Sequence, residues 1–131
     1  MLIAVESRDR THYLSEIRSY YRLRKLVFAD QLGWEVPCFG DEERDELDEN
    51  ACTYILKVGD DGEVEAGARL IPTSRKTLLE HAFPDLVPEW NEFVSPTIIE
   101  SSRYCVRPQS SAERVRAGVR RNAVELSLAS L

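Results

Sequence analysis

Residues 100–106 read Glu100-Ser101-Ser102-Arg103-Tyr104-Cys105-Val106. Ile98 and Ile99 precede it, so residues 98–106 form an apolar run that predicts a buried strand, which we expect to be the central one. A carboxylate and a guanidinium inside such a strand need partners, because an unpaired buried charge is strongly destabilising. The two charges therefore indicate a functional site or, as the alternative, a structural ion pair or an edge strand that faces water.

Three more strands are predicted upstream. Residues 53–58 and 64–71 are apolar runs separated by Gly59-Asp60-Asp61-Gly62, a sequence typical of a hairpin turn, and Pro72 ends the second run. Residues 2–5 fit a first strand.

Helices are predicted between and after these strands. Thr11 is a candidate N-cap for a helix that ends at Gly33, with apolar residues at helical spacing. Residues 77–83 predict a short helix. Ser110 and Glu113 have capping-box spacing and predict a last helix from there onward. Strand, helix, hairpin, long strand and helix together predict an α+β fold.

Length and composition fit one domain, residues 1–131, because 131 residues with 43% hydrophobic content can bury one modest core. No apolar run approaches the ~18 residues of a membrane span, and Glu6 comes too early for a signal peptide, so we expect a cytoplasmic protein. Cys38, Cys52 and Cys105 are odd in number and widely spaced. Reduced thiols are therefore expected rather than a disulfide or a zinc site.

The charge is unevenly distributed along the chain. The formal net charge of −6 argues against a nucleic-acid-binding protein. Residues 103–121 nevertheless hold six arginines and one acid, Glu113, which is a local charge of +5. This basic block would face an acidic partner, although a basic helix face that balances nearby acids is the alternative. Its arginines are Arg103, Arg107, Arg114, Arg116, Arg120 and Arg121.

Residues 30–50 are rich in acids, Gly and Pro and predict a long irregular segment, which in a compact domain is often a binding loop. A disordered acidic loop is the alternative. Trp34 and Phe39 favour a loop that partly folds back over a pocket, because large aromatic side chains gain most from burial. Asp45 and Asp48 have D-x-x-D spacing, but neither histidines nor an EF-hand glycine accompany them, so we expect no metal.

Eight positions resemble, in order, the LuxI-type acyl-homoserine-lactone synthases, the autoinducer synthases of bacterial quorum sensing. They are Arg24, Phe28 and Trp34 in RKLVFADQLGW, Asp45 and Asp48 in ERDELDEN, Arg69 in GARLIPT, and Glu100 and Arg103 in ESSRYCV. The chain resembles the N-terminal part of that family. The resemblance implies a fold similar to the GCN5-related N-acetyltransferases, with a mixed sheet flanked by helices and splayed open for an acyl-pantetheine arm.

Two departures from the family pattern stand out. Ile99 replaces an aromatic residue that many relatives have before the glutamate. Family members also continue through a further strand and helices that complete the sheet and the acyl pocket, so we expect residues 1–131 to be a truncated domain, either a fragment or a natural truncation. Such a chain lacks one wall of the acyl cleft. We therefore expect it to be inactive, to bind S-adenosylmethionine weakly and to form oligomers or aggregate.

The resemblance implies acyl transfer from acyl carrier protein or acyl-CoA to the amine of S-adenosylmethionine, followed by lactonisation and release of methylthioadenosine. Both reactants are substrates, so no cofactor is implied. The amine must lose a proton, which makes Glu100 the candidate general base, with Arg103 beside it in the catalytic pair. The implied substrate-binding residues are Arg24, Phe28, Trp34, Asp45, Asp48 and Arg69.

The side chains suit this substrate. Trp34 and Phe28 offer faces for the adenine or the sulfonium, and Arg24 or Arg103 offers paired donors for the carboxylate. Asp45 and Asp48 either meet the cationic end or pair with Arg69 and Arg103 to hold the loop. An acidic carrier protein with its phosphopantetheine would face the basic block, namely Arg107, Arg114, Arg116, Arg120 and Arg121.

Two other functions stay open from the sequence. A generic N-acetyltransferase usually has a Q/R-x-x-G-x-G/A loop after the central strand, and residues 107–114 contain no glycine. A truncated, non-catalytic module that binds S-adenosylmethionine or docks a carrier protein is the second.

Overall fold

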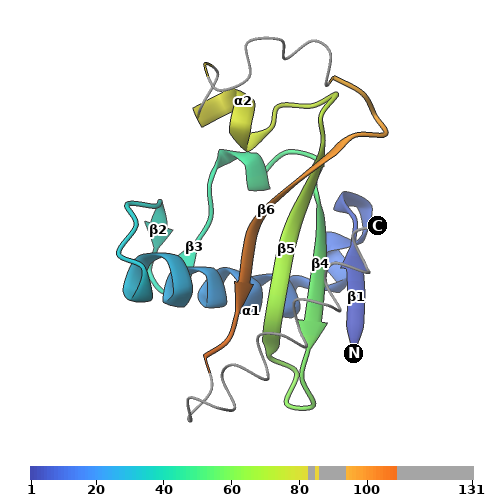
Figure 1. The fold of residues 1–131 in the computed structure, drawn as a ribbon. Coiled ribbons are helices and arrows are strands. Elements are labelled where there is room, and N and C mark those ends of the chain that lie inside the picture. The colour runs from blue at the N-terminus through green and yellow to red at the C-terminus, as the bar shows by residue number, and fades with distance from the viewer. Residues whose placement is uncertain (83–84, 86–93, 109–131) are drawn as a thin grey trace.

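The computed structural model describes residues 1–82, 85 and 94–108 (Figure 1). The elements in chain order are β1 (Leu2–Val5), the 3₁₀-helix η1 (Ser7–His12), α1 (Leu14–Arg24), the π-helix η2 (Lys25–Gln31), β2 (Cys38–Phe39), β3 (Glu42–Glu43), the 3₁₀-helix η3 (Glu46–Asp48), β4 (Thr53–Val58), β5 (Val64–Pro72), α2 (Leu78–Ala82) and β6 (Ile99–Val106). This is the α+β content that the sequence predicts, and the predicted strands are confirmed to within a residue or two. The predicted C-terminal helix and its Ser110–Glu113 start lie outside the described residues.

The main sheet has the order β1-β4-β5-β6, and each neighbouring pair is antiparallel (Figure 1). The mixed sheet that the resemblance implies is therefore not formed by the described strands. β6 lies at the edge of this order, and within it Cys105 alone is buried while Glu100 is half-buried. The prediction of a buried central strand is thus wrong for the described part of the sheet, and the edge-strand alternative holds. The ion-pair alternative holds as well, because Arg103 pairs with Glu43 and Asp45.

The long predicted helix is divided into three helical segments. Thr11 is not the N-cap, because it lies within η1, and α1 begins only at Leu14 after Tyr13. At Lys25 the α-helix changes to the π-helix η2, a widened form that often accompanies functional sites. The predicted end is confirmed, since Gly33 has φ +68°, a conformation that a residue without Cβ adopts at no steric cost.

The core lies between α1 and one face of the sheet, with α1 crossing behind β4, β5 and β6 in Figure 1. Strand side chains alternate between faces, so Tyr54 and Leu56 of β4 point toward α1, opposite Arg69 and Gly67 of β5. Tyr20 of α1 is fully buried among them. The described part of the chain contains no helix long and apolar enough to cross a membrane.

Candidate substrate site

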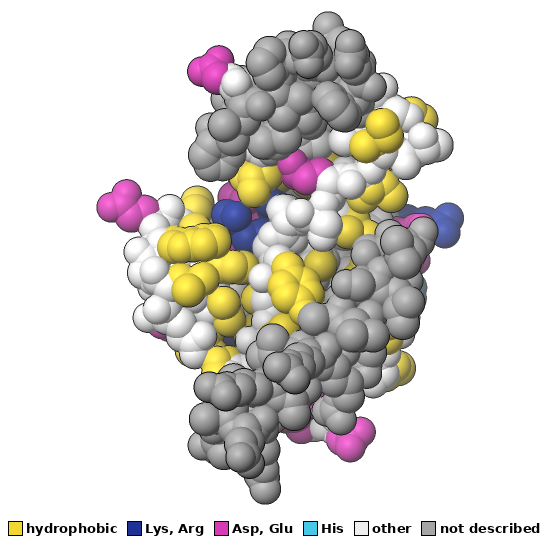
Figure 2. Space-filling model, in the orientation of Figure 1, with side chains coloured by type: hydrophobic (Ala, Val, Ile, Leu, Met, Phe, Trp, Pro, Cys, Tyr) yellow, Lys and Arg dark blue, Asp and Glu magenta, His cyan; other side chains and the backbone are white. Residues whose placement is uncertain are grey.

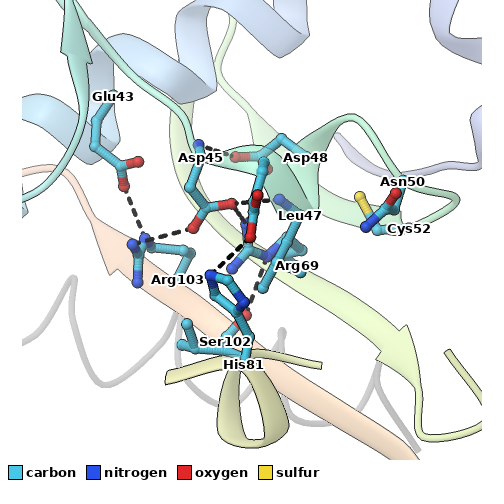
Figure 3. A network of polar contacts seen from close by, with 12 residues as sticks. Glu43, Asp45, Leu47, Asp48, Asn50, Cys52, Arg69, His81, Ser102 and Arg103 are labelled. Atoms are coloured by element: carbon cyan, nitrogen blue, oxygen red, sulfur yellow. Dashed lines mark hydrogen bonds and ion pairs between the residues drawn. The ribbon is translucent and has the colours of Figure 1, made fainter. Parts of the chain in front are cut away.

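The candidate site lies on the α1 face of the sheet, where β5 and β6 meet the acidic segment (Figure 3). The register pairs Arg69 with Ser102, which brings Arg103 and the loop residues Asp45 and Asp48 into one neighbourhood. Asp45 and Asp48 are held by a capping box at η3: Leu47 N donates to Asp45, and Asp45 N donates to Asp48. The sequence therefore folds the acidic segment back onto the sheet.

Three guanidinium groups and three carboxylates interlock at this place. Arg24 donates to both oxygens of Asp48 at 2.7 and 2.9 Å and to Glu43 at 2.9–3.2 Å. Arg69 lies 2.6 Å from Asp45 and 3.2 Å from Asp48. Arg103 donates from Nε to Glu43 at 2.8 Å and from Nη2 to Asp45 at 3.2 Å. The network has no net formal charge, which is what allows it to be buried.

Burial and pairing set the protonation of this network. Burial alone would raise the pKa of Asp48, but the hydrogen bonds and charge of Arg24 and the charge of Arg69 outweigh it and lower the pKa well below its ordinary value. Burial, followed by the charge of Asp48, raises the pKa of Tyr54, whose hydroxyl donates to Asp48 at 2.8 Å. At neutral pH the carboxylate is thus ionised and the phenol is neutral.

The carboxylates do not form a cation site. One oxygen each from Glu43, Asp45 and Asp48 lies within 4.8 Å of the others, a spacing that a metal ion would accept. Each of these carboxylates, however, is already paired with two arginines through hydrogen bonds or ion pairs. Their charge is neutralised and their lone pairs are engaged, so the chemistry of the donor set does not fit a metal.

An aromatic surface adjoins the network. Trp34 stacks on Phe28 with ring centroids 5.1 Å apart and an interplanar angle of 18°, and Trp34 N donates to Phe28 O at 2.8 Å. Arg103 lies over the Phe28 ring at 5.7 Å. Phe28 is buried, whereas Trp34 is 52% exposed. On the face that Figure 2 shows, hydrophobic side chains gather beside a small basic patch. The stacked Trp34 and Phe28 rings offer an aromatic surface that can contact a flat ring or a cation.

Glu100 lies on the same strand face, two residues before Ser102. At ~3.3 Å per residue the two Cα atoms are ~7 Å apart. Its Oε1 accepts a hydrogen bond from Leu78 N at 2.8 Å, at the start of α2. Farther along α2, His81 Nε2 lies 2.7 Å from Glu46 Oε1, which ties this helix to the loop that carries Asp45 and Asp48. α2 thus connects Glu100 with the acidic segment.

The structure brings together all eight residues of the sequence resemblance, but not in equal roles. Arg24 has no exposed surface and its donors face Glu43 and Asp48, whereas Arg103, the other candidate for a substrate carboxylate, is slightly exposed. Asp45 is in the second of its two expected arrangements, paired with Arg69 and Arg103. Arg69 is fully buried, and its Nη2 has no hydrogen-bond partner among the described residues.

Sequence reasoning missed Glu43, Ser102 and Tyr54. Residues 41–49 contain seven acids, and nothing in that run distinguishes Glu43, which is fully buried, from its exposed neighbour Asp41. Of the predicted basic block, Arg107 donates to Val64 O at 2.8 Å and lies near the β4–β5 turn. Arg114, Arg116, Arg120 and Arg121 lie outside the described residues.

Known proteins are similar to this chain in sequence and in fold. Residues 9–131 match the family described as autoinducer synthase. The chain is 32% identical over 130 residues to an acyl-homoserine-lactone synthase of Agrobacterium fabrum, covering 99% of this chain and 58% of that protein. It is 40% identical over 90 residues to a probable acyl-homoserine-lactone synthase of Sinorhizobium fredii, covering 69% and 43%.

A solved structure of an acyl-homoserine lactone synthase is also similar to this chain. BjaI, a CoA-dependent acyl-homoserine lactone synthase determined with SAM and isopentyl-CoA, superimposes with a TM-score of 0.72 at 25% identity, covering 95% of this chain and 61% of that one. The chain thus spans about half the length of the curated relatives it matches. The resemblance read from the eight residues is confirmed: the chain belongs to the autoinducer synthase family and corresponds to roughly the N-terminal half of its acyl-homoserine-lactone synthases.

Proposed function

We propose that this chain carries the S-adenosylmethionine-binding and acyl-acceptor side of an acyl-homoserine-lactone synthase. The amine of S-adenosylmethionine attacks the carbonyl carbon of an acyl thioester, an amide bond forms, and the thiol leaves with a proton. The methionine carboxylate then displaces methylthioadenosine at the γ-carbon and closes the lactone. Membership of the family and the solved relative with SAM and isopentyl-CoA support this assignment.

Glu100 is the proposed general base. An amine near neutral pH is mostly protonated, and a carboxylate within reach, directly or through a water molecule, is the minimum that the attack requires. Glu100 is half-buried on the strand face that also carries Ser102 and Arg103, and α2 holds its carboxylate through Leu78 N. Because Glu100 is half-buried on an edge strand, its carboxylate can reach a substrate that binds from solvent.

Arg103, Phe28 and Trp34 are the proposed contacts of S-adenosylmethionine. The exposed face of Trp34, stacked on Phe28, suits the adenine or the sulfonium. The Arg103 side chain is slightly exposed, so its guanidinium can pair with the substrate carboxylate while it keeps Glu43. Arg24, Asp45, Asp48 and Arg69 are proposed to hold the loop in place, and Arg69 Nη2 could also donate to a substrate oxygen.

The observation that carries the proposal is the convergence of a carboxylate, a partly exposed guanidinium and a stacked aromatic pair on one face of the sheet. A generic N-acetyltransferase has no need of that combination. The acyl donor is proposed to be a thioester of acyl carrier protein or coenzyme A, with the basic block of residues 107–121 facing the carrier protein.

The test is to assay two purified proteins: this chain, and this chain joined to the C-terminal remainder of the Agrobacterium fabrum relative. Each is mixed with S-adenosylmethionine and acyl-CoA or acyl carrier protein, and mass spectrometry measures methylthioadenosine and acylated homoserine lactone. Calorimetry measures binding of S-adenosylmethionine to the chain alone. Product from either protein supports the proposal. If neither forms product, the enzyme proposal fails, and binding without product would instead favour a non-catalytic binding module.

A further inference from the structure

Arg103 has an unusual backbone. Its φ of +55° is the one positive value at a residue other than glycine in the described part of the chain. A side chain with a Cβ adopts this left-handed conformation only where the surroundings hold it there. The conformation belongs to a β-bulge: β5 pairs Arg69 with Ser102 and Gly67 with Cys105, so Ala68 faces two residues, Arg103 and Tyr104.

The bulge explains how Arg103 reaches the site. In a regular strand successive side chains point to opposite faces, so Arg103 would point away from the face that Ser102 occupies. Here both face the network: the Ser102 hydroxyl accepts from Arg69 Nε at 3.1 Å, and Arg103 donates to Glu43 and Asp45. The extra residue thus redirects the guanidinium, and any group that fixes the bulge also fixes Arg103.

Tyr20 makes that contact. This residue of α1 is fully buried, and its hydroxyl donates to the backbone carbonyl of Arg103 at 2.7 Å. Burial, together with the nearby Cys105, raises the pKa of Tyr20 well above its ordinary value, so the phenol keeps its proton throughout the neutral range. The hydrogen bond joins positions 83 residues apart in the sequence and crosses from the helix to the bulge.

Gly67 makes room for the Tyr20 ring. A Cβ added at Gly67 would lie 2.5 Å from Tyr20 Cε2 and 2.7 Å from Cδ2, closer than real Cβ contacts come. Gly67 is also the β5 residue paired with Cys105, at the end of the bulge. The ring therefore rests directly on the β5 backbone, and its hydroxyl reaches the carbonyl of Arg103 from there.

We propose that Tyr20, seated against Gly67, is a positioning residue that holds the bulge at Arg103 and so directs the Arg103 guanidinium to the substrate site. The inference rests on the proposed function only in that Arg103 contacts the substrate carboxylate. The geometric part, that Tyr20 sets the placement of Arg103, stands apart from any activity.

The geometric part is tested by NMR on the full 131-residue chain. Tyr20→Phe keeps the ring and removes the hydroxyl, and Tyr13→Phe is the matched control, since Tyr13 lies just before α1 and away from the bulge. Arg103 Nε–H is bonded to Glu43, so its hydrogen exchange reports whether that contact persists. We expect exchange at least ~10-fold faster in Tyr20→Phe and unchanged in Tyr13→Phe. Equal rates in the two variants would overturn the proposal.

Gly67→Ala provides a second variant. Its Cβ displaces the Tyr20 ring, while Tyr20 keeps its hydroxyl. It should also accelerate Arg103 Nε–H exchange, whereas exchange like that of the wild type would show that the ring need not rest on β5 and would overturn the role of Gly67. Urea midpoints of the variants, measured alongside, separate a local change from global unfolding.

The functional part is read from kinetics in whichever protein forms product. Tyr20→Phe should lower kcat by ~10-fold with little change in KM for the acyl thioester, because a guanidinium displaced by even ~1 Å loses much of its effect in the transition state. In an Arg103→Lys background the same change should have less than a ~2-fold effect, since residues acting through one another are not additive. An equal loss in both backgrounds would contradict action through Arg103.

If neither wild-type protein forms product, the proposed function has failed. The exchange experiment still decides whether Tyr20 sets the placement of Arg103.

Discussion

Arg24 and Asp48 form a bidentate ion pair in which the arginine side chain is fully buried: Arg24 Nη1 lies 2.7 Å from Asp48 Oδ1, and Arg24 Nη2 lies 2.9 Å from Asp48 Oδ2. The same guanidinium also holds Glu43, and Tyr20 and Tyr21 lie against it at 5.4 and 5.3 Å. Arg24 therefore joins α1 to both β3 and η3. In this structure Arg24 thus holds the acidic segment against α1.

Replacing Arg24 by Lys should destabilise the chain severely. One ammonium cannot bond both Asp48 and Glu43 in the paired geometry of a guanidinium, and leaving a buried carboxylate uncompensated costs ~3–5 kcal/mol. Arg18→Lys is the control, because Arg18 pairs with Glu42 at 3.1 Å but is mostly exposed, and such pairs contribute ~1 kcal/mol or less. Urea denaturation measures both. A free energy of unfolding for Arg24→Lys equal to that of Arg18→Lys would show that the buried pair does not hold the loop.

The low pKa of Asp48 predicts loss of stability in acid. Burial raises that pKa, but Arg24 and Arg69 lower it by more than burial raises it. The folded chain therefore keeps the carboxylate ionised at pH values below the ordinary aspartate pKa of ~3.9. The resulting stabilisation is complete above that unfolded-state pKa and is lost as the pH falls toward the folded one. The free energy of unfolding should therefore drop between about pH 5 and pH 2.

Asp48→Asn should flatten this part of the pH profile. Asp30→Asn is the control, since Asp30 pairs with Lys25 at an exposed position. Chemical denaturation at successive pH values gives the three curves. A profile for Asp48→Asn as steep as that of the wild type would assign the acid sensitivity to other groups.

The three cysteines should differ sharply in reactivity. Cys38 is exposed on β2, whereas Cys52 and Cys105 are buried. Burial raises the pKa of Cys52, and it raises the pKa of Cys105 to about 12, so neither presents a thiolate near neutral pH. Brief alkylation of the native chain followed by mass spectrometry should modify Cys38 alone, and all three after denaturation. Labelling of Cys105 at the rate of Cys38 would contradict its burial.

The strands were predictable from the sequence because their signals are local. Residues 53–58 and 64–71 carry alternating or continuous apolar runs around a Gly-containing turn, and β4 and β5 form there. The long helix was predicted as one piece because the π-helix at Lys25–Gln31 is only 7 residues long, too short to change the apolar spacing recognisably. The edge position of β6 depends on pairing across the whole sheet, which no local pattern records.

The site was predictable only through the joint pattern of its residues. Asp45, Arg69 and Arg103 were found, and their mutual pairing was one of two arrangements that the sequence left open. Glu43 was missed because acids crowd its segment. The bulge at Arg103 was missed because the tyrosine that contacts it lies on a helix far away in the sequence. The placement of both residues depends on burial and on contacts between segments far apart in the sequence, which a local pattern does not record.

Glu100→Gln tests whether Glu100 is the general base, because it changes one oxygen of that carboxylate and keeps the side-chain shape. The measurement is the single-turnover rate of acylation of S-adenosylmethionine in the form of the protein that makes product, with binding of S-adenosylmethionine followed by calorimetry. Glu80→Gln, an exposed glutamate on α2, is the control. We expect Glu100→Gln to bind S-adenosylmethionine as the wild type does but to acylate it ~10²-fold or more slowly. Glu80→Gln should match the wild type in both binding and acylation rate. Acylation by Glu100→Gln within a few-fold of the wild-type rate would show that Glu100 is not the general base.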